Sequence, residues 1–174
     1  SMGHTTSANR TAEIPCGAGM YADQNCSTEC KRCEEGRFSN DAVNAICTCA
    51  GGGHTSSDDR TRQVPCGVGY YAAGECNSQC SFCLPGKFAS IQGMHDCICA
   101  SPGHTVTPAR DNESACAAGF YAAGQCNAEC TPCAPGRFSN NLVDGNADCD
   151  CASAGHTNNS NNTEEIVCEP GTFQ

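Results

Sequence analysis

The sequence contains no tryptophan and few large apolar side chains of any kind. Only six Phe and four Tyr occur in 174 residues, and much of the 39% hydrophobic fraction is cysteine and alanine. Such a chain has too little apolar surface for a conventional core of this length. No apolar run approaches the ~20 residues that a membrane-spanning helix needs, so we expect no direct membrane span in this segment.

Basic residues are also scarce. Lys and Arg total 9 against 19 Asp and Glu, which gives a formal net charge of −10. Nucleic-acid phosphates and anionic lipid surfaces both favour a basic protein surface. We therefore expect no nucleic-acid partner, and we interpret the acidity as a means of keeping a secreted chain in solution.

Signatures of catalysis are missing as well. The sequence has no Gly-x-Ser-x-Gly turn for a serine nucleophile, no glycine-rich phosphate loop and no His-Glu-x-x-His zinc motif. A cysteine nucleophile needs a free thiolate beside a base, and near-identical repeats offer no unique pocket for one. We expect that the chain is not an enzyme and has no catalytic residue and no cofactor.

Cysteine, in contrast, is abundant and periodic, with 19 copies. The motif Cys-x-x-Gly-x-(Tyr/Phe) recurs along the chain, so that a unit of about fifty residues is copied three times and a fourth copy begins, which we expect to be truncated. We place the repeats at residues 1–50, 51–100, 101–152 and 153–174. The motif begins at Cys16, Cys33, Cys66, Cys83, Cys116, Cys133 and Cys168.

Each complete repeat carries six cysteines, which suits three disulfide bridges better than it suits zinc. Zinc usually takes four ligands in paired Cys-x-x-Cys spacing. Disulfides persist in oxidising compartments, so we expect an extracellular protein that is secreted or lies at the cell surface. The cysteines expected to form disulfides are Cys16, Cys26, Cys30, Cys33, Cys47, Cys49, Cys66, Cys76, Cys80, Cys83, Cys97, Cys99, Cys116, Cys126, Cys130, Cys133, Cys149 and Cys151, with Cys168 unpaired or intermodular.

Regular secondary structure should be sparse. Gly, Pro, Asn and Ser throughout the chain predict small disulfide-rich repeats with short two-stranded β-ribbons. Contacts between neighbouring repeats alone predict an elongated tandem array. Residues 42–46 and 121–123 are expected to hold a helical turn. In the short motif, the glycine closes a tight turn and the aromatic ring lies over the adjacent disulfide.

Residues 66–99, CGVGYYAAGECNSQCSFCLPGKFASIQGMHDCIC, show the repeated pattern best. Here Cys-x-x-Gly-x-Tyr is followed by Cys-x3-Cys-x2-Cys-x-x-Gly-x-Phe, which resembles the TNF-receptor and ephrin-receptor-like cysteine-rich repeats of extracellular proteins. The resemblance implies bonds from first to second, third to fifth and fourth to sixth cysteine. In the first repeat it implies the pairs Cys16–Cys26, Cys30–Cys47 and Cys33–Cys49, and it leaves Cys168 without a partner.

A second interpretation starts at a different cysteine. Cys97-Ile98-Cys99-x3-Gly103 resembles the end of an EGF-like module, with Cys116 as its last cysteine. This EGF-like resemblance also pairs Cys168 with Cys151 and leaves Cys16 without a partner. The pairs that it implies in the second repeat are Cys76–Cys83, Cys80–Cys97 and Cys99–Cys116.

A polar arm separates Gly-His-Thr from the next cysteine in every repeat, at residues 5–13, 55–63, 105–114 and 157–165. These arms are rich in Ser, Thr, Asn and Asp and hold most of the Asn-x-(Ser/Thr) acceptor sequences for N-linked glycans. We expect at least Asn9 or Asn112 to carry a glycan, and O-linked sugars are a further expectation for the clustered Thr and Ser. The acceptor asparagines are Asn9, Asn25, Asn112, Asn158 and Asn161.

One histidine per repeat lies in Gly-His-Thr, at His4, His54, His104 and His156. A single histidine without a second ligand nearby does not define a metal site, so we expect none. We interpret each as a turn residue whose ring hydrogen-bonds the backbone. Residues 111–113, Asp-Asn-Glu, resemble part of calcium-binding EGF modules and leave a local calcium site as an alternative.

Two functions fit these observations. Near-identical units form a regular surface that can stack in register. We therefore expect a glycosylated structural protein that self-associates in a fibre, a flagellar hair or a cell-surface coat. The alternative is a ligand-binding or adhesive receptor ectodomain, in which one repeat differs on an exposed face.

Overall fold

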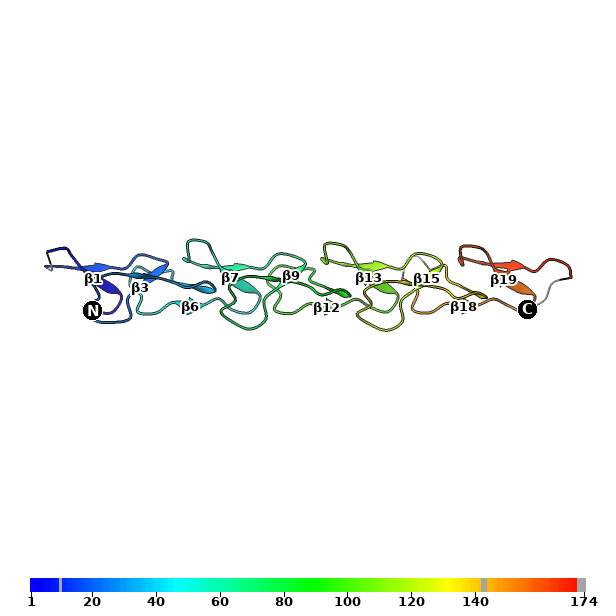
Figure 1. Cartoon of the computed structure of the whole chain (residues 1–174), viewed down its shortest axis with the longest axis horizontal. Helices are drawn as coiled ribbons and strands as arrows, with labels where there is room; N and C mark the ends of the chain where they lie inside the picture. The colour runs from blue at the N-terminus through cyan, green and yellow to red at the C-terminus, as the bar shows by residue number, and fades with distance from the viewer. Residues whose placement is uncertain (10, 142–143, 172–174) are drawn as a thin grey trace. The chain divides into compact units, whose positions relative to one another are not determined.

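The computed structural model describes residues 1–9, 11–141 and 144–171, and its secondary structure consists of β-strands alone. Twenty strands of two or three residues form ten two-stranded antiparallel ribbons (Figure 1). No helix occurs among the described residues, and therefore none long and apolar enough to cross a membrane. The predicted class of small disulfide-rich repeats with short β-ribbons is confirmed, while the elongation of the array stays a prediction.

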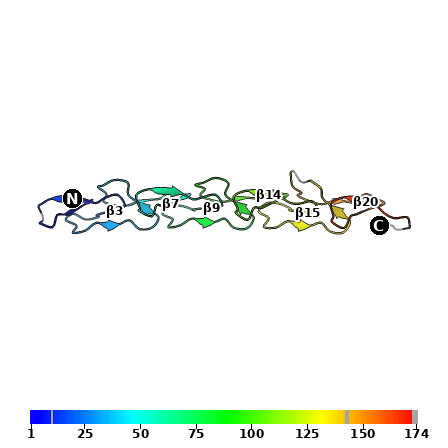
Figure 2. The same cartoon turned by 90° about the horizontal axis from the view of Figure 1, so that it is seen from above.

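Each complete repeat contains three ribbons, one in the polar arm and one in each of the two cysteine-rich loops. Long loops join the short strands, as Figure 2 also shows. The ribbons of the first repeat are β1 (His4–Thr6) with β2 (Glu13–Pro15), β3 (Met20–Tyr21) with β4 (Lys31–Arg32), and β5 (Arg37–Phe38) with β6 (Thr48–Cys49).

The same order recurs in the later repeats. The second has β7 (His54–Ser56) with β8 (Gln63–Pro65), β9 (Tyr70–Tyr71) with β10 (Ser81–Phe82), and β11 (Lys87–Phe88) with β12 (Ile98–Cys99). The third has β13 (His104–Val106) with β14 (Glu113–Ala115), β15 (Phe120–Tyr121) with β16 (Thr131–Pro132), and β17 (Arg137–Phe138) with β18 (Asp150–Cys151). The fourth contributes β19 (His156–Asn158) with β20 (Glu165–Val167).

The chain divides into two compact units. The first comprises Ser1–Phe82 and Ile91–Asp96, and the second comprises Cys83–Ser90 and Cys97–Gln174. The division runs through the second repeat, so a compact unit is not one fifty-residue repeat. The repeat boundaries expected from the sequence describe the period of the sequence. Whether each repeat is also a separate domain stays a prediction.

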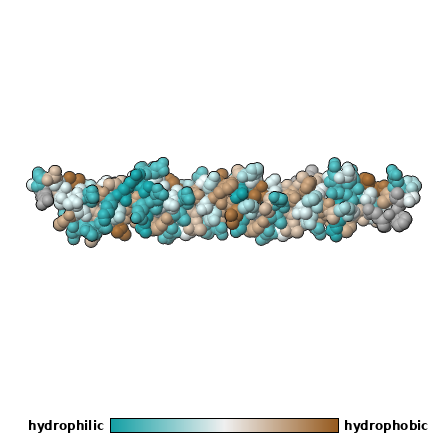
Figure 3. Space-filling view, viewed as in Figure 1, coloured by the Kyte–Doolittle hydropathy of each residue, from teal (hydrophilic) through white to brown (hydrophobic). Residues whose placement is uncertain are grey.

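Cysteine and alanine fill the buried positions that large aliphatic side chains fill in most proteins. Phe88, at 9% exposure, is the one large apolar side chain among the buried described residues, whereas Ile46, Leu84 and Ile91 are exposed. On the face drawn in Figure 3, apolar residues are scattered among hydrophilic ones. The largest fully buried side chains are Cys16, Cys33, Cys66, Cys83, Cys116 and Ser139.

The glycine of the short motif is required for two structural reasons. Gly36, three residues after Cys33, has a φ of +78°, a conformation that residues with a Cβ resist. It also lies against the carbonyl of Cys76, which a Cβ at this position would overlap. The expected tight turn is confirmed, and the close approach explains further why no larger residue fits.

The helical turns expected at residues 42–46 and 121–123 are wrong. Tyr121 belongs to strand β15, and residues 42–46 form bends. In the latter segment, the carbonyl of Asn44 accepts a hydrogen bond from the amide of Ala22 instead of from a helical neighbour. A helical turn would instead need that carbonyl to accept from the amide four residues later.

Candidate functional site: the disulfide network and the polar hairpins

Eight disulfides follow one rule. Within a repeat, the first cysteine bonds the third and the fourth bonds the fifth, while the sixth bonds the second cysteine of the next repeat. The bonds within repeats are Cys16–Cys30, Cys33–Cys47, Cys66–Cys80, Cys83–Cys97, Cys116–Cys130 and Cys133–Cys149. Those between repeats are Cys49–Cys76, inside the first compact unit, and Cys99–Cys126, inside the second.

Their backbone spacing is that of ordinary disulfides. The Cα–Cα distance is 5.7 Å for Cys16–Cys30 and 5.8 Å for Cys33–Cys47, and it shortens to 4.5 Å for the inter-repeat bond Cys49–Cys76. All lie within the range that a disulfide can span. The inter-repeat bonds close loops with a sequence separation of 27, against 14 for most bonds within repeats.

Neither pairing carried over from a resemblance matches this network. The receptor-like interpretation joins Cys16 to Cys26, but Cys26 is exposed on the loop between β3 and β4, while Cys16 is 1% exposed. Ribbon β3–β4 returns the chain so that Cys30 lies next to Cys16. The receptor-like pairs Cys30–Cys47 and Cys33–Cys49 are therefore replaced as well.

The EGF-like pairs are replaced for a similar reason. Ribbon β11–β12 returns the chain to place Cys97 beside Cys83, so Cys83 is not available to Cys76, nor Cys97 to Cys80. Cys99 bonds Cys126 rather than Cys116.

Three cysteines have no disulfide partner in the part of the chain that the structure describes. Cys26 and Cys151 are exposed and Cys168 is half-buried. Cys168 was expected to be left over in the receptor-like interpretation, whereas Cys26 and Cys151 were expected to be bonded. The other sixteen cysteines take part in disulfides as the sequence predicted.

The polar arms form the β-hairpins β1–β2, β7–β8, β13–β14 and β19–β20. In each of the last three, one arginine or asparagine side chain donates a hydrogen bond to a cysteine carbonyl of the preceding repeat, a contact that we call the clasp. In the first compact unit, Arg60 has a φ of 60°, and its carbonyl accepts a hydrogen bond from Ser39 N at 3.0 Å. Its guanidinium donates to the carbonyl of Cys33 at 2.5 Å and lies 3.4 Å from the carboxylate of Glu35. One residue thus ties a hairpin to the buried cysteine loop of the repeat before it.

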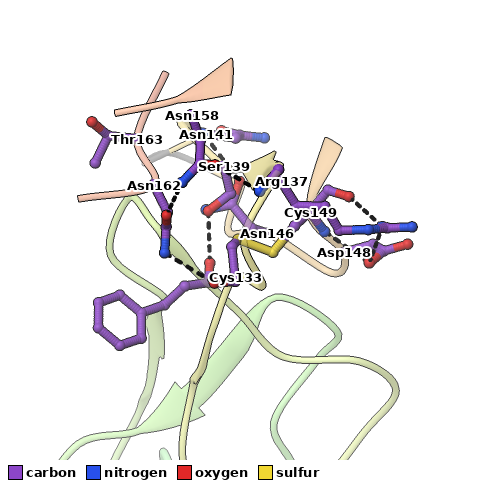
Figure 4. The surroundings of a disulfide bond; sticks show 12 residues. Cys133, Arg137, Ser139, Asn141, Asn146, Asp148, Cys149, Asn158, Asn162 and Thr163 are labelled. Atoms are coloured by element: carbon purple, nitrogen blue, oxygen red, sulfur yellow. Dashed lines mark hydrogen bonds and ion pairs between the residues drawn. A yellow bond between two sulfur atoms is a disulfide. The ribbon is translucent and has the colours of Figure 1, made fainter. Parts of the chain in front are cut away.

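The second compact unit repeats this clasp twice. Arg110 donates to the carbonyl of Cys83, and Asn162 donates to the carbonyl of Cys133 at 2.9 Å (Figure 4). Sequence reasoning missed the clasp. The available signal was an arginine or asparagine at the same place in every repeat, six residues before the first cysteine; its first instance, Arg10, lies outside the described residues.

A second hydrogen bond accompanies two of the three clasps, those of Arg60 and Asn162. Ser56 Oγ accepts from the amide of Gly36 at 3.1 Å, and Asn158 Oδ1 accepts from the amide of Gly136 at 2.6 Å. The polar arms are therefore partly buried structural elements rather than free chains. Their Ser and Asn side chains satisfy backbone amides that would otherwise lack partners.

The hairpin tips are closed by side chains. The carboxylate of Asp59 accepts hydrogen bonds from Ser57 Oγ at 2.6 Å, Thr61 Oγ1 at 2.8 Å and Thr61 N at 3.2 Å. These bonds, that of Ser57 first, lower the pKa of Asp59 from 3.8 to about 2, because they stabilise the charged form. In the first repeat Asn9 takes the same place and accepts from Ser7 and Thr11.

The acceptor asparagines differ in accessibility. Asn9, Asn25, Asn112 and Asn161 are exposed. Asn158 is half-buried, and its side-chain amide donates to the carbonyl of Asn159 and to the side chain of Asn162. The fold therefore leaves four of the five open to a glycan and uses the fifth to hold the repeats together; whether any glycan is attached stays a prediction.

Each histidine of Gly-His-Thr is bonded to its own turn. Nδ1 lies 3.0 Å from the carbonyl two residues earlier in His54 and 3.1 Å from it in His104. His4 and His156 make the same contact, which confirms their interpretation as turn residues. Among the described residues, no group of three or more His, Cys, Asp or Glu could hold a metal ion.

One exposed ribbon position differs between the repeats and carries an aromatic pair in the second. On ribbon β9–β10, Tyr70 lies opposite Phe82, with ring centroids 5.0 Å apart, and both side chains are about 40% exposed. The corresponding pairs are Met20 with Arg32 in the first repeat and Phe120 with Pro132 in the third. Phe173, the aromatic residue of the last motif, lies outside the described residues.

Comparison with known proteins adds no family to this description. A scan of the chain against models of known protein families finds no match, and neither does a search of curated proteins. The fold and its disulfides by themselves define the class, a disulfide-rich repeat module of the kind typical of extracellular proteins.

Proposed function

We propose that this chain is part of an extracellular structural protein whose repeats associate with other copies to build a fibre, a flagellar hair or a cell-surface coat. The observation that carries the proposal is the recurrence of one bonding pattern. Cys49–Cys76 with the Arg60 clasp in the first compact unit matches Cys99–Cys126 with the Arg110 clasp in the second. Because the same inter-repeat disulfide and the same clasp recur, successive repeats present similar outer surfaces, which favours stacking in register.

Composition supports the same proposal. Sixteen bonded cysteines stabilise the chain where reducing agents are absent. The exposed acceptor sites Asn9, Asn112 and Asn161 on the polar hairpins would carry N-linked glycans outward. In this proposal the chain has no catalytic role.

Electron microscopy of the native material tests the proposal. Self-association predicts filaments or a regular layer at the cell surface, and purified chain should sediment as oligomers whose size grows with concentration. A chain that stays monomeric at every concentration, and is found dispersed on the surface, would contradict it. Treatment with N-glycosidase should lower the intact mass; an unchanged mass removes the N-linked glycans from the proposal without affecting assembly.

An adhesive or ligand-binding ectodomain is the second candidate, and one observation favours it. Tyr70 and Phe82 of the second repeat form an exposed aromatic pair that no other repeat has among the described residues. Exposed aromatic side chains are frequent anchors of binding surfaces. If this candidate is right, a Tyr70→Ser, Phe82→Ser variant loses adhesion of the chain to its native surface, whereas Met20→Ser at the same position of the first repeat keeps it.

A further inference from the structure

The three unpaired cysteines obey the same bonding rule as the sixteen bonded ones. Second-position cysteines bond a sixth cysteine 27 residues earlier, as Cys76 and Cys126 do. First-position cysteines bond a third cysteine 14 residues later, as Cys16 and Cys66 do. Counted from Cys26, Cys151 and Cys168, the partner that the rule requires falls in each case outside Ser1–Gln174.

The backbone at Cys26 already has the conformation of a bonded cysteine. Its φ is 65°, against 59° at Cys76 and 61° at Cys126, which both carry the inter-repeat disulfide. A positive φ is uncommon for a residue other than glycine. Cys26 thus has the backbone conformation that the bond uses in the two later repeats.

The surroundings of Cys26 lack a hydrogen bond that accompanies the bond elsewhere. Thr55 Oγ1 donates to the carbonyl of Ser78 at 3.0 Å, and Thr105 Oγ1 to that of Ala128 at 2.8 Å, each two residues after the bonded cysteine. The equivalent Thr5 Oγ1 is buried and has no hydrogen-bond partner among the described residues. The loop that carries Cys26 therefore differs from the bonded loops at the point where the disulfide is absent.

The partner also has a defined backbone contact. The amide of Cys76 donates to the carbonyl of Ala50 at 2.9 Å, and the amide of Cys126 donates to that of Ala100 at 3.0 Å. Both alanines directly follow a sixth cysteine, as Ala152 follows Cys151. A segment that bonds Cys26 must therefore offer a cysteine followed by a residue with an accessible carbonyl.

We infer that Cys26, Cys151 and Cys168 are attachment points for further repeats of the same kind in the same polypeptide. Cys26 bonds the sixth cysteine of a preceding repeat, and Cys151 and Cys168 bond the second and third cysteines that complete the fourth repeat. Cys151 of a second copy is a less suitable partner for Cys26. In the bonded repeats one hairpin lies between the sixth cysteine and the second cysteine that it bonds, whereas here hairpin β19–β20 of one copy and hairpin β1–β2 of the other would compete for that position. The inference holds for a fibre and for a receptor alike.

Each bond forms by oxidation of two thiols. The two sulfur atoms lose their protons and join, and the two electrons pass to a small-molecule disulfide such as oxidised glutathione, which is reduced to two thiols. An oxidising secretory compartment supplies this class of oxidant.

Two extended chains test the inference, with the 174-residue chain as reference. Duplicating residues 51–100 ahead of Ser1 places a copy of Cys99 27 residues before Cys26. Appending a copy of residues 73–100 after Gln174 places copies of Cys76 and Cys80 at the spacings that Cys151 and Cys168 require. All three are secreted from an oxidising host, and thiols are labelled with N-ethylmaleimide without denaturant and located by mass spectrometry.

The reference chain should be labelled at Cys26, Cys151 and Cys168. The first extension should lose the label at Cys26 and gain one at its copy of Cys76, so the number of thiols stays at three. The second should lose the labels at Cys151 and Cys168 together and gain one at its copy of Cys99. In a control, the first extension with its copy of Cys99 changed to Ser should regain the label at Cys26.

Cleavage beside Asp23 and Glu29 isolates Cys26 from Cys16 and Cys30, so its partner can be read directly. The inference is overturned if Cys26 stays labelled in the first extension as strongly as in the control. It is also overturned if Cys26 bonds Cys151 of the same or another chain. The eight disulfides of the reference chain, mapped in the same digest, show that each extension has folded.

Discussion

At the scale of single residues, short polar side chains close the hairpin tips by hydrogen bonds, as capping side chains do at the ends of helices. Asp59 and Asn9 occupy equivalent hairpin tips and accept the same hydrogen bonds, one as a charged group and the other as a neutral amide. The sequence showed these arms to be polar, but it did not show that the tips of the first two repeats are each closed around one acceptor. In both tips the backbone amide two residues after the acceptor donates to its side chain, as in an Asx turn.

The tip of the second repeat should respond to pH. The pKa of Asp59 falls from 3.8 to about 2 on folding, so its contribution to stability is present above pH 3.8 and is lost as the pH falls through about 2. An NMR titration of the Asp59 carboxyl carbon should give a midpoint near 2, and Asp59→Asn should keep the turn while removing its dependence on pH. A midpoint near the ordinary value of 3.8 would contradict the hydrogen-bonded tip.

At the scale of elements, each hairpin and cysteine loop is held from outside itself. The glycine of the short motif lets one backbone approach another, and the arginine or asparagine clasp joins a hairpin to the preceding repeat. Sequence alone predicted the glycine turn, because glycine adopts a positive φ much more readily than a residue with a Cβ does. The clasp was not predicted, because an arginine that binds a neighbouring repeat has the same local sequence as a solvated one. Only its recurrence six residues before each first cysteine indicates a structural role.

Gly36→Ala should destabilise the first compact unit by about 2 kcal/mol or more. The φ of +78° alone costs about 1 kcal/mol for a residue with a Cβ, and the Cβ would overlap the carbonyl of Cys76. Gly74→Ala, at a φ of +73° in open space, should show the conformational cost alone, and Gly17→Ala, with neither constraint, should show no loss. Chemical denaturation with the disulfides intact ranks the three; equal effects would argue against the close approach.

Arg60→Ala should destabilise the same unit by about 1–2 kcal/mol, because the charged hydrogen bond to the carbonyl of Cys33 is lost at a side chain only 16% exposed. Its contact with Glu35, which is 69% exposed, adds little, so Glu35→Gln should be nearly neutral. Arg60→Asn should restore part of the stability, since Asn162 makes the equivalent bond. An Arg60→Ala variant as stable as the parent would contradict the claim that the clasp stabilises this unit.

At the scale of the whole molecule, sulfur replaces the hydrophobic core. The sequence predicted this from its cysteine count, its lack of tryptophan and its few aliphatic residues, and buried cysteine and alanine confirm it. The pairing could not be predicted from those features. Cys16 and Cys26 are consecutive cysteines in the sequence. The ribbon that pairs Met20 with Arg32 nevertheless places Cys30 beside Cys16 and leaves Cys26 exposed.

Loss of an inter-repeat bond should be costly. Replacing both Cys49 and Cys76 by Ala removes a constraint on a loop with a sequence separation of 27, which corresponds to about 3.5 kcal/mol of stability in the chain-entropy description. Cys26→Ser, at an exposed and unbonded position, should leave stability unchanged. Denaturant unfolding of the two variants compares them; a double variant as stable as Cys26→Ser would mean that the inter-repeat bond does not hold the first two repeats together.

The most direct test of the account is a disulfide map of the unreduced 174-residue chain by peptide mass spectrometry. The account predicts first-to-third and fourth-to-fifth bonds in every complete repeat, such as Cys16–Cys30 and Cys33–Cys47, with Cys49–Cys76 and Cys99–Cys126 between repeats. Bonds such as Cys16–Cys26 and Cys33–Cys49, or a majority of cysteines recovered as free thiols, would contradict it.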